Sequence, residues 1–181
     1  MAVSKTLAAF LTKSRVKYKG LTHPAVYTAQ EIAAAQHVPG KQLAKCVLVT
    51  TDKGFYLAIL PAIHLIDFDK LKRLLRVKKL SLAKEADIKT LFPDAEVGAM
   101  SVFGNLYNVP VAVDKALGES ADMVCNAGSH TQTIKLRYAD FERLVKPKVG
   151  PFGLHIAKAK GKAAPAKRKP TASKKKKKPT R

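Results

Sequence analysis

Residues 43–60 read Leu43-Ala-Lys-Cys-Val-Leu-Val-Thr50, Thr51-Asp-Lys-Gly54 and Phe55-Tyr-Leu-Ala-Ile-Leu60. Two apolar runs flank a polar turn that ends in glycine, and this is the pattern of a β-hairpin. The first run is apolar on both faces, because alternate side chains of a strand point to opposite sides. Such a strand is usually covered on both sides, as in a layered fold that mixes helices and strands.

Helix-like and strand-like segments interleave on both sides of this hairpin. Thr28-Ala-Gln-Glu31 has the form of a capping box and predicts the start of a helix. The sequence therefore predicts an α/β mixed (α+β) fold. Helices are also predicted at 2–15, 67–76, 83–92 (with Ser81 before it) and 138–145, and strands at 17–22, 109–113, 122–126 and 132–137.

The composition changes near residue 150. Aromatic residues end at Phe152, and Ala, Lys, Pro and Gly dominate the remaining residues. Such a segment buries too little apolar surface to offset the entropy lost on ordering. We therefore expect one folded domain at 1–150 and a basic tail at 151–181, disordered from about residue 154.

The net charge of +21 is concentrated at the C-terminal end. Residues 146–181 carry 14 basic and no acidic side chains, which leaves 20 basic and 13 acidic ones in the first 145 residues. A polyanion is the natural partner, with nucleic acid ahead of a membrane surface. The alternative is a solubilising tail without a specific partner. The candidate nucleic-acid-binding residues are Lys167, Arg168, Lys169, Lys174, Lys175, Lys176, Lys177 and Lys178.

Several classes of protein are excluded or disfavoured. The chain has no apolar run long enough to span a membrane and no signal-peptide pattern, so a cytoplasmic protein is expected. Cys46 and Cys125 sit in apolar runs and are expected to be buried free thiols. The histidines lack zinc-ligand spacing, and neither a Walker-type loop nor G-x-G-x-x-G occurs. No metal or cofactor is expected.

Lys45 is the unusual charge of the hairpin. It lies near the start of an apolar strand, so its ammonium group either reaches water at the strand end or projects into a cleft. In a cleft, the ammonium could hold a phosphate or a developing oxyanion.

Two small-residue turns complete the candidate site. They are Gly98-Ala-Met-Ser-Val-Phe-Gly104 and Cys125-Asn-Ala-Gly-Ser-His-Thr131. Tight glycine turns bring backbone N–H groups and short hydroxyl side chains close to a ligand. Together with Lys45 they predict a site for a small polar or anionic group. A serine hydrolase is disfavoured because no G-x-S-x-G elbow occurs, and His130 is either a base or a turn residue.

These turns also carry a resemblance. Together with Thr22-His-Pro-Ala-Val-Tyr-Thr28 and Gln42-Leu-Ala-Lys-Cys-Val47, they follow the order seen in the YbaK/ProX family of aminoacyl-tRNA deacylases. This family is related to the editing domain of bacterial prolyl-tRNA synthetase, and the resemblance covers roughly residues 20–147. It implies a curved mixed sheet surrounded by helices.

The resemblance also implies a function. It predicts a free-standing enzyme that hydrolyses mischarged aminoacyl-tRNA in trans, with aminoacyl-tRNA as substrate and an aminoacyl-tRNA synthetase as a further candidate partner. The signature lysine matches Lys45, and the glycine turns match Gly98 and Gly128, which are the candidate catalytic positions. Val102 stands where many members carry proline. Candidate substrate-binding residues are His23, Tyr27, Thr28, Ser101, Val102, Phe103, Gly104, Asn126, Ser129, His130 and Thr131.

The chemistry suits these residues, because an aminoacyl ester is already activated and needs positioning and oxyanion stabilisation above all. The sequence leaves open whether a bound water or a substrate hydroxyl assists the attack. Two other interpretations stay open. One is a non-catalytic nucleic-acid-binding protein that acts through its tail, and the other is a module that binds an aminoacyl adenylate or amino acid without hydrolysis.

Overall fold

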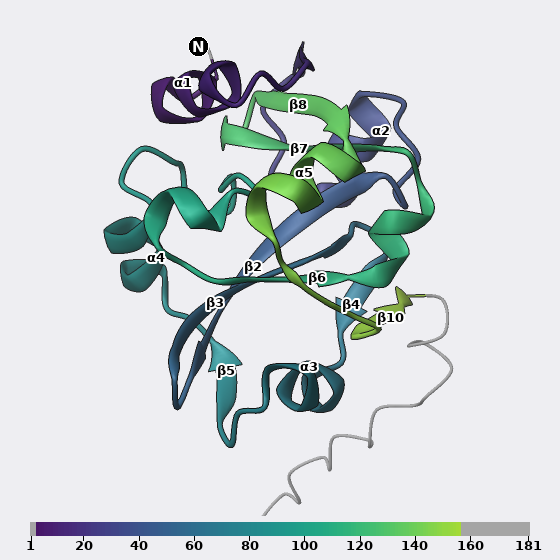
Figure 1. Cartoon of the computed structure of the whole chain (residues 1–181). Helices are drawn as coiled ribbons and strands as arrows, with labels where there is room; N and C mark the ends of the chain where they lie inside the picture. The colour runs from purple at the N-terminus through teal and green to yellow at the C-terminus, as the bar shows by residue number, and fades with distance from the viewer. Residues whose placement is uncertain (1–2, 157–181) are drawn as a thin grey trace, which may run out of the picture.

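The computed structural model describes residues 3–156, and in this part helices and strands alternate along the chain. Figure 1 shows extended strands through the middle of the molecule, with helices around them. The predicted mixed α+β class is confirmed. The helices are α1 (Lys5–Lys13), α2 (Ala29–Ala35), α3 (Phe68–Leu75), α4 (Glu85–Leu91) and α5 (Tyr138–Val145), with 3-10 helices η1 (Gly104–Tyr107) and η2 (Lys115–Glu119).

The strands belong to two sheets of unequal size. In the larger sheet the neighbours run β1-β8-β7-β2-β3-β6-β9, and β5 pairs with β2 beside this path. The sheet is mixed, since β2 is antiparallel to β3 and parallel to β7. The strands are β1 (Tyr18–Thr22), β2 (Leu43–Thr51), β3 (Gly54–Pro61), β4 (His64–Ile66), β5 (Leu80–Leu82), β6 (Val111–Asp114), β7 (Asp122–Ser129), β8 (Gln132–Arg137), β9 (Lys148–Gly150) and β10 (Gly153–His155).

The predicted hairpin is the β2–β3 pair. Its register places Leu48 opposite Leu57, and the two strands are joined through Gly54. Gly54 has φ +104°, a conformation that glycine adopts without the steric cost of a Cβ atom. The position of this glycine in the sequence therefore specified the turn.

Strand β2 is covered on both faces, as its apolar pattern predicted. On one face Leu48 belongs to the same buried cluster as Leu7 of α1. On the other face Val49 is buried in a cluster with Leu71 and Leu75 of α3. The alternation of the strand thus separates two cores, and the face of a β2 residue decides which core it joins.

A smaller apolar cluster lies at the start of β2. Leu43 packs there with Ile32 of α2, and with Val124 of β7. The predicted capping box places α2 at this position: the Thr28 side chain accepts from the Glu31 backbone N–H, and the Glu31 carboxylate accepts from the Thr28 N–H. This end of β2 is where the candidate site forms.

Four short strands, β4, β5, β9 and β10, were not predicted. Ser81, expected to precede a helix, lies in β5 opposite Thr50 of β2. β10 pairs with β4 through Leu154 and Leu65, so regular structure extends past the predicted boundary at residue 150. A three-residue strand carries too weak a pattern to be recognised without its partner. The remainder of the predicted tail, 157–181, lies outside the described residues.

Candidate functional site

A small hollow lies where β2 begins. It has a volume of ≈ 170 Å³, and α2, β2, β7 and the loop before η1 contribute to its wall. We call it the Lys45 pocket. Its lining residues are Tyr27, Ala29, Ile32, Leu43, Ala44, Lys45, Cys46, Gly98 and Asn126.

Lys45 contributes the basic group of this pocket. The residue is half-buried, and burial lowers the pKa of its ammonium group because the charged form loses hydration. A cation held partly out of water attracts an anion more strongly than an exposed one. The lysine therefore projects into a cleft, which was one of the two placements that the sequence left open.

The first glycine turn borders the same pocket. Gly98 has φ +89° and lines the hollow, and the Asn126 side-chain Nδ2 donates a hydrogen bond to its carbonyl oxygen at 3.3 Å. Asn126 also presents its Oδ1, a buried atom that has no hydrogen-bond partner among the residues the structure covers. Lys45, Gly98 and Asn126 are thus the polar groups brought together here.

The second glycine turn supports the first one. The Gly128 N–H donates to the Ala99 carbonyl oxygen at 3.1 Å, and the Glu96 N–H donates to the Gly128 carbonyl oxygen at 2.9 Å. Gly128 has φ +103° and lies where the register of β7 and β8 shifts, between Asn126 and Ser129. The two turns are therefore held together by backbone hydrogen bonds.

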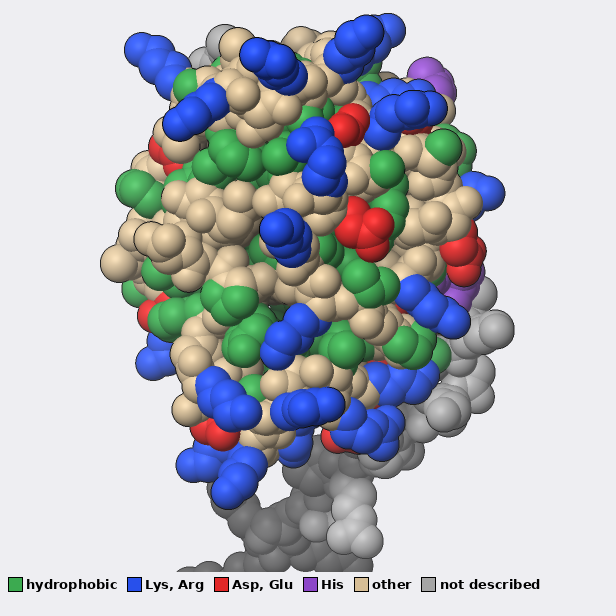
Figure 2. Space-filling view, viewed as in Figure 1, with side chains coloured by type: hydrophobic (Ala, Val, Ile, Leu, Met, Phe, Trp, Pro, Cys, Tyr) green, Lys and Arg blue, Asp and Glu red, His purple; other side chains and the backbone are tan. Residues whose placement is uncertain are grey.

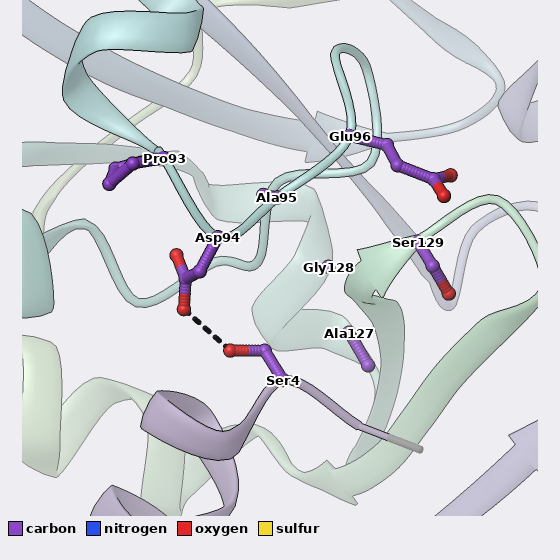
Figure 3. Close-up of a pocket in the computed structure, with 8 residues that line it drawn as sticks. All are labelled: Ser4, Pro93, Asp94, Ala95, Glu96, Ala127, Gly128 and Ser129. Atoms are coloured by element: carbon purple, nitrogen blue, oxygen red, sulfur yellow. Dashed lines mark hydrogen bonds between the residues drawn. The ribbon is translucent and has the colours of Figure 1, made fainter. Parts of the chain in front are cut away.

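Gly128 and Ser129, however, line a different hollow, shown in Figure 3. Its volume is ≈ 350 Å³, and Asp94 and Glu96 contribute to its wall together with Ser4. We call it the Asp94 hollow. The second turn is thus divided between two hollows: Asn126 lines the Lys45 pocket, whereas Gly128 and Ser129 face the Asp94 hollow, because the bulge after Asn126 interrupts the alternation of the strand.

Asp94 is already well satisfied within its hollow. Its carboxylate accepts hydrogen bonds from the Ser4 hydroxyl and from the Tyr107 hydroxyl, each at 2.6 Å. Burial raises the pKa of Asp94, but these hydrogen bonds outweigh that effect and the net shift is downward. The carboxylate therefore anchors the chain before α1 to the loop that follows α4.

His130 lies behind the Lys45 pocket. Its Nε2 donates to the Val97 carbonyl oxygen at 2.9 Å, and its backbone N–H donates to the Glu96 carboxylate at 2.7 Å. The centroid of the imidazole ring lies 4.8 Å from that of the Tyr27 ring, with the two planes tilted by 55°, and Tyr27 is 73% exposed and lines the pocket. His130 is thus positioned to support the Gly98 turn and Tyr27.

The residues after Gly98 are placed away from the pocket wall. Val102 and Phe103 have 0% exposure and belong to the large core cluster, and Phe103 packs edge-on against Phe10. A Cβ atom at Gly104 would lie 2.7 Å from the Val109 carbonyl oxygen. Residues 102–104 therefore have a packing role, since apolar side chains gain more from the core than from a wet pocket, and the substrate-binding role expected for them stays a prediction. Ser101 is also buried.

The remaining predicted residues organise the segment before α2. The His23 N–H donates to the Thr131 carbonyl oxygen at 3.0 Å, and its ring Nδ1 donates to the Pro24 carbonyl oxygen at 2.8 Å. Thr28 is used as the helix cap, and Ser129 lies 3.4 Å from the Thr131 hydroxyl. None of these four is among the pocket-lining residues. The candidate nucleic-acid-binding residues 167–178 lie outside the described part of the chain.

The apolar wall of the pocket was not predicted as such. Ala29, Ile32, Leu43 and Ala44 looked like ordinary core positions, and only the proximity of the α2 cap to Lys45 could have marked them. Cys46 also lines the pocket, and burial raises the pKa of its thiol well above the usual value. A neutral buried thiol is a poor nucleophile, so Cys46 forms part of the wall.

Within residues 3–156 no group of three or more His, Cys, Asp or Glu side chains is arranged to hold a metal ion. In the same range no helix is long and apolar enough to cross a membrane.

The chain is similar to known aminoacyl-tRNA editing proteins. The family model described as "Aminoacyl-tRNA editing domain" matches residues 23–144. The "Prolyl-tRNA editing protein ProX" of Acetoanaerobium sticklandii is 26% identical over 152 residues, which are 81% of this chain and 92% of that protein.

Solved structures share the fold. A candidate trans-editing enzyme for prolyl tRNA synthetase superimposes with a TM-score of 0.72 at 20% identity, over 83% of this chain and 96% of that one. A scaffold protein used for epitope backbone grafting superimposes with a TM-score of 0.75 at 19% identity, over 84% and 97% of the two chains.

Proposed function

The chain belongs to the aminoacyl-tRNA editing domain family, and on that premise we propose that the Lys45 pocket is its catalytic site. The protein is a trans-editing deacylase: it hydrolyses the ester that joins a wrong amino acid to tRNA. The observation that supports this placement is the half-buried ammonium group of Lys45 beside the Gly98 turn.

The proposed reaction needs little more than positioning and charge stabilisation. Water adds to the ester carbonyl carbon and the carbonyl oxygen becomes an oxyanion. The oxyanion then re-forms the carbonyl, the bond to the ribose oxygen breaks, and that oxygen takes up the proton that the water gives up. The Lys45 ammonium stabilises the oxyanion, because a partly desolvated cation interacts strongly with developing charge. The Gly98 turn contributes backbone groups at the same point.

Asn126 is proposed to orient the substrate. Its Nδ2 is used on the Gly98 carbonyl oxygen, and its buried Oδ1 is free to accept a hydrogen bond from the α-ammonium group of the amino acid. A buried acceptor without a partner is unfavourable, so a substrate donor stabilises the complex. Tyr27 at the mouth of the pocket offers an exposed ring for stacking of the terminal base.

The size of the pocket limits the amino acid. A volume of ≈ 170 Å³ with apolar walls from Ala29, Ile32 and Leu43 suits a small uncharged side chain. Size exclusion rejects larger side chains efficiently, whereas one methylene too few changes binding by only about 1–3 kcal/mol. Since the similar curated protein is named for prolyl-tRNA editing, we propose tRNA for proline, carrying a smaller amino acid, as the substrate.

The basic segment at 157–181 is proposed to raise the affinity for tRNA. It contains 12 of the 34 Lys and Arg residues and no acidic one, and such a segment binds phosphates without reading sequence. Action in the cytoplasm and contact with an aminoacyl-tRNA synthetase belong to the same proposal.

A panel of mischarged tRNAs tests this function. Wild type is expected to release a small amino acid from tRNA for proline, and Lys45→Ala is expected to lose most of that activity while Lys41→Ala, an exposed neighbour, keeps it. Initial rates of amino acid release are measured. Equal rates for wild type and Lys45→Ala on every tRNA of the panel would remove Lys45 from the mechanism.

A further inference from the structure

A second basic surface lies on the folded domain, around α3. Residues 67–79 contain six basic and two acidic side chains. Figure 2 shows Lys and Arg side chains gathered over the end of the molecule where Figure 1 places α3 and β5. We call this group the α3 surface. Its members are Lys70, Lys72, Arg73, Arg76, Lys78 and Lys79.

The α3 surface keeps its charge turned outward. Leu71 and Leu75 are buried against the sheet, so the opposite side of the helix faces solvent, where Lys70 and Arg73 are exposed. Among the residues that the structure covers, only Lys70 of this surface is in an ion pair, with Asp67 at 3.5 Å. The remaining positive charge of the surface is therefore available to a polyanion.

A hollow on this surface combines charge with an apolar floor. It has a volume of ≈ 380 Å³ and is lined by Lys70 and Arg73, together with Leu74, Pro151 and Phe152. Two cations over apolar side chains match a nucleotide, whose phosphate is anionic and whose base and sugar offer less polar surface. A protein partner has no such regular alternation of phosphate and flat base.

The hollow is on the same face of the sheet as Lys45. Lys45 and Val49 point to the same side of β2, and Val49 is buried in one cluster with Leu71 and Leu75 of α3. The α3 surface and the Lys45 side chain therefore lie on the same face of the large sheet.

The paired strands β4 and β10 connect the two places. At one end, the Ala62 N–H, two residues before β4, donates to the carbonyl oxygen of Leu43 at the start of β2 at 2.8 Å. At the other end, the Asp67 N–H before α3 donates to the Phe152 carbonyl oxygen at 2.8 Å. Three residues of extended strand cover about 10 Å, so only a few nucleotides separate the pocket from the hollow.

We propose that the α3 surface binds the phosphate backbone of the tRNA acceptor arm while the aminoacylated 3′ end occupies the Lys45 pocket. The inference rests on the proposed function, because the pocket sets the direction in which the nucleic acid leaves it. Lys70 and Arg73 hold the tRNA phosphate backbone at the hollow. This contact fixes the position of the tRNA and does not recognise its base sequence.

The test uses the full chain and two substrates. One is mischarged tRNA, and the other is the same amino acid esterified to adenosine, which carries no phosphate and cannot engage α3 from the pocket. Lys70→Glu/Arg73→Glu is compared with wild type and with Lys13→Glu/Lys17→Glu. The control pair is also exposed, changes the net charge equally and lies at the end of α1 and just after it, on the opposite side of the sheet.

The α3 variant is expected to lose about tenfold or more in kcat/KM on tRNA, through KM, and to keep wild-type rates on the adenosine ester. The slope of log tRNA affinity against log salt concentration is expected to become shallower, by the equivalent of about two phosphate contacts. Circular dichroism checks that both variants fold, since the buried face of α3 is unchanged. The neutral pair Lys70→Gln/Arg73→Gln is expected to give a smaller loss in the same direction.

Two outcomes would overturn the inference. They are an equal loss in the α1 control or an equal loss on the adenosine ester. Failure of the proposed function looks different, because wild type would then hydrolyse neither substrate.

Discussion

The Lys45 pocket and the Asp94 hollow lie on either side of two glycine turns that are hydrogen-bonded to each other, yet they carry opposite charge. The pocket is smaller and holds a half-buried cation. The hollow holds Asp94 and Glu96, and both carboxylates already accept protein hydrogen bonds. An oxyanion or a phosphate is stabilised in the first and repelled in the second.

This difference shows that similar turns need not have similar roles. Gly98 and Gly128 both have positive φ, but only Gly98 lines the pocket beside the ammonium group. The other turn holds Gly98 in place through the bonds of Ala99 and Glu96. In our interpretation one side of this pair of turns performs the chemistry and the other maintains its geometry.

The largest effect is expected on removing the Lys45 cation from the pocket, and removing the Asp94 charge from the hollow serves as the comparison. Lys45→Met keeps an unbranched side chain and removes the cation, so kcat/KM on mischarged tRNA is expected to fall about 100-fold or more, as on loss of one oxyanion-stabilising group. Asp94→Asn, on the other side, is expected to change it by less than about threefold. Initial rates with subsaturating substrate measure both. A comparable loss in the two variants would contradict the division of roles.

A smaller and more diagnostic effect is expected at the two glycines. An L-residue with positive φ costs about 1–2 kcal/mol, so both Gly98→Ala and Gly128→Ala destabilise the fold. The added Cβ at Gly128 would also lie 3.2 Å from the Ser4 Cβ, whereas at Gly98 the neighbour is His130 Cε1 at 3.5 Å. Gly128→Ala is therefore expected to lose more stability, and Gly98→Ala more activity. Urea unfolding and initial rates give the two rankings, and reversed rankings would refute the assignment.

The smallest effect concerns pH and the Asp94 hollow. The pKa of Asp94 is lowered in the folded protein, because hydrogen bonds from Ser4 and Tyr107 outweigh the effect of burial. A carboxyl whose folded pKa is depressed adds stability above its unfolded pKa, near 3.9, and this stability is lost as the pH falls through the folded value. The excess stability of wild type over Asp94→Asn is expected to be constant from pH 7 to 5 and to shrink below pH 4. Urea unfolding at each pH measures it, and a constant difference down to pH 3 would contradict the shift.

Long, strongly patterned elements were recognisable without the structure. The capping box at Thr28 and Glu31 marked the start of α2, and the α5 pattern coincided with Tyr138–Val145. The β2–β3 hairpin followed from its glycine turn. In each case the decisive interactions join residues close in the chain, so a local pattern contains them.

The candidate site was recognisable only in part. Lys45 stood out because a lysine is rare in a strand that is apolar on both faces, and the structure places it in a pocket. Val102 and Phe103 looked equally suited to the site, and they are core residues instead. An apolar residue beside a glycine turn carries no local sequence signal that distinguishes the wall of a pocket from the packed interior.

Local sequence was thus sufficient for the fold class, the five helices, the hairpin and the choice of Lys45, since propensity, capping and alternation act over a few residues. The partnership of β4 with β10, the division of the second glycine turn between two hollows and the placement of α3 on the face of Lys45 were decided by pairing and burial between distant segments. Those contacts form only when the whole chain has collapsed around its cores, because the free energy of burial belongs to surfaces that no single segment contains.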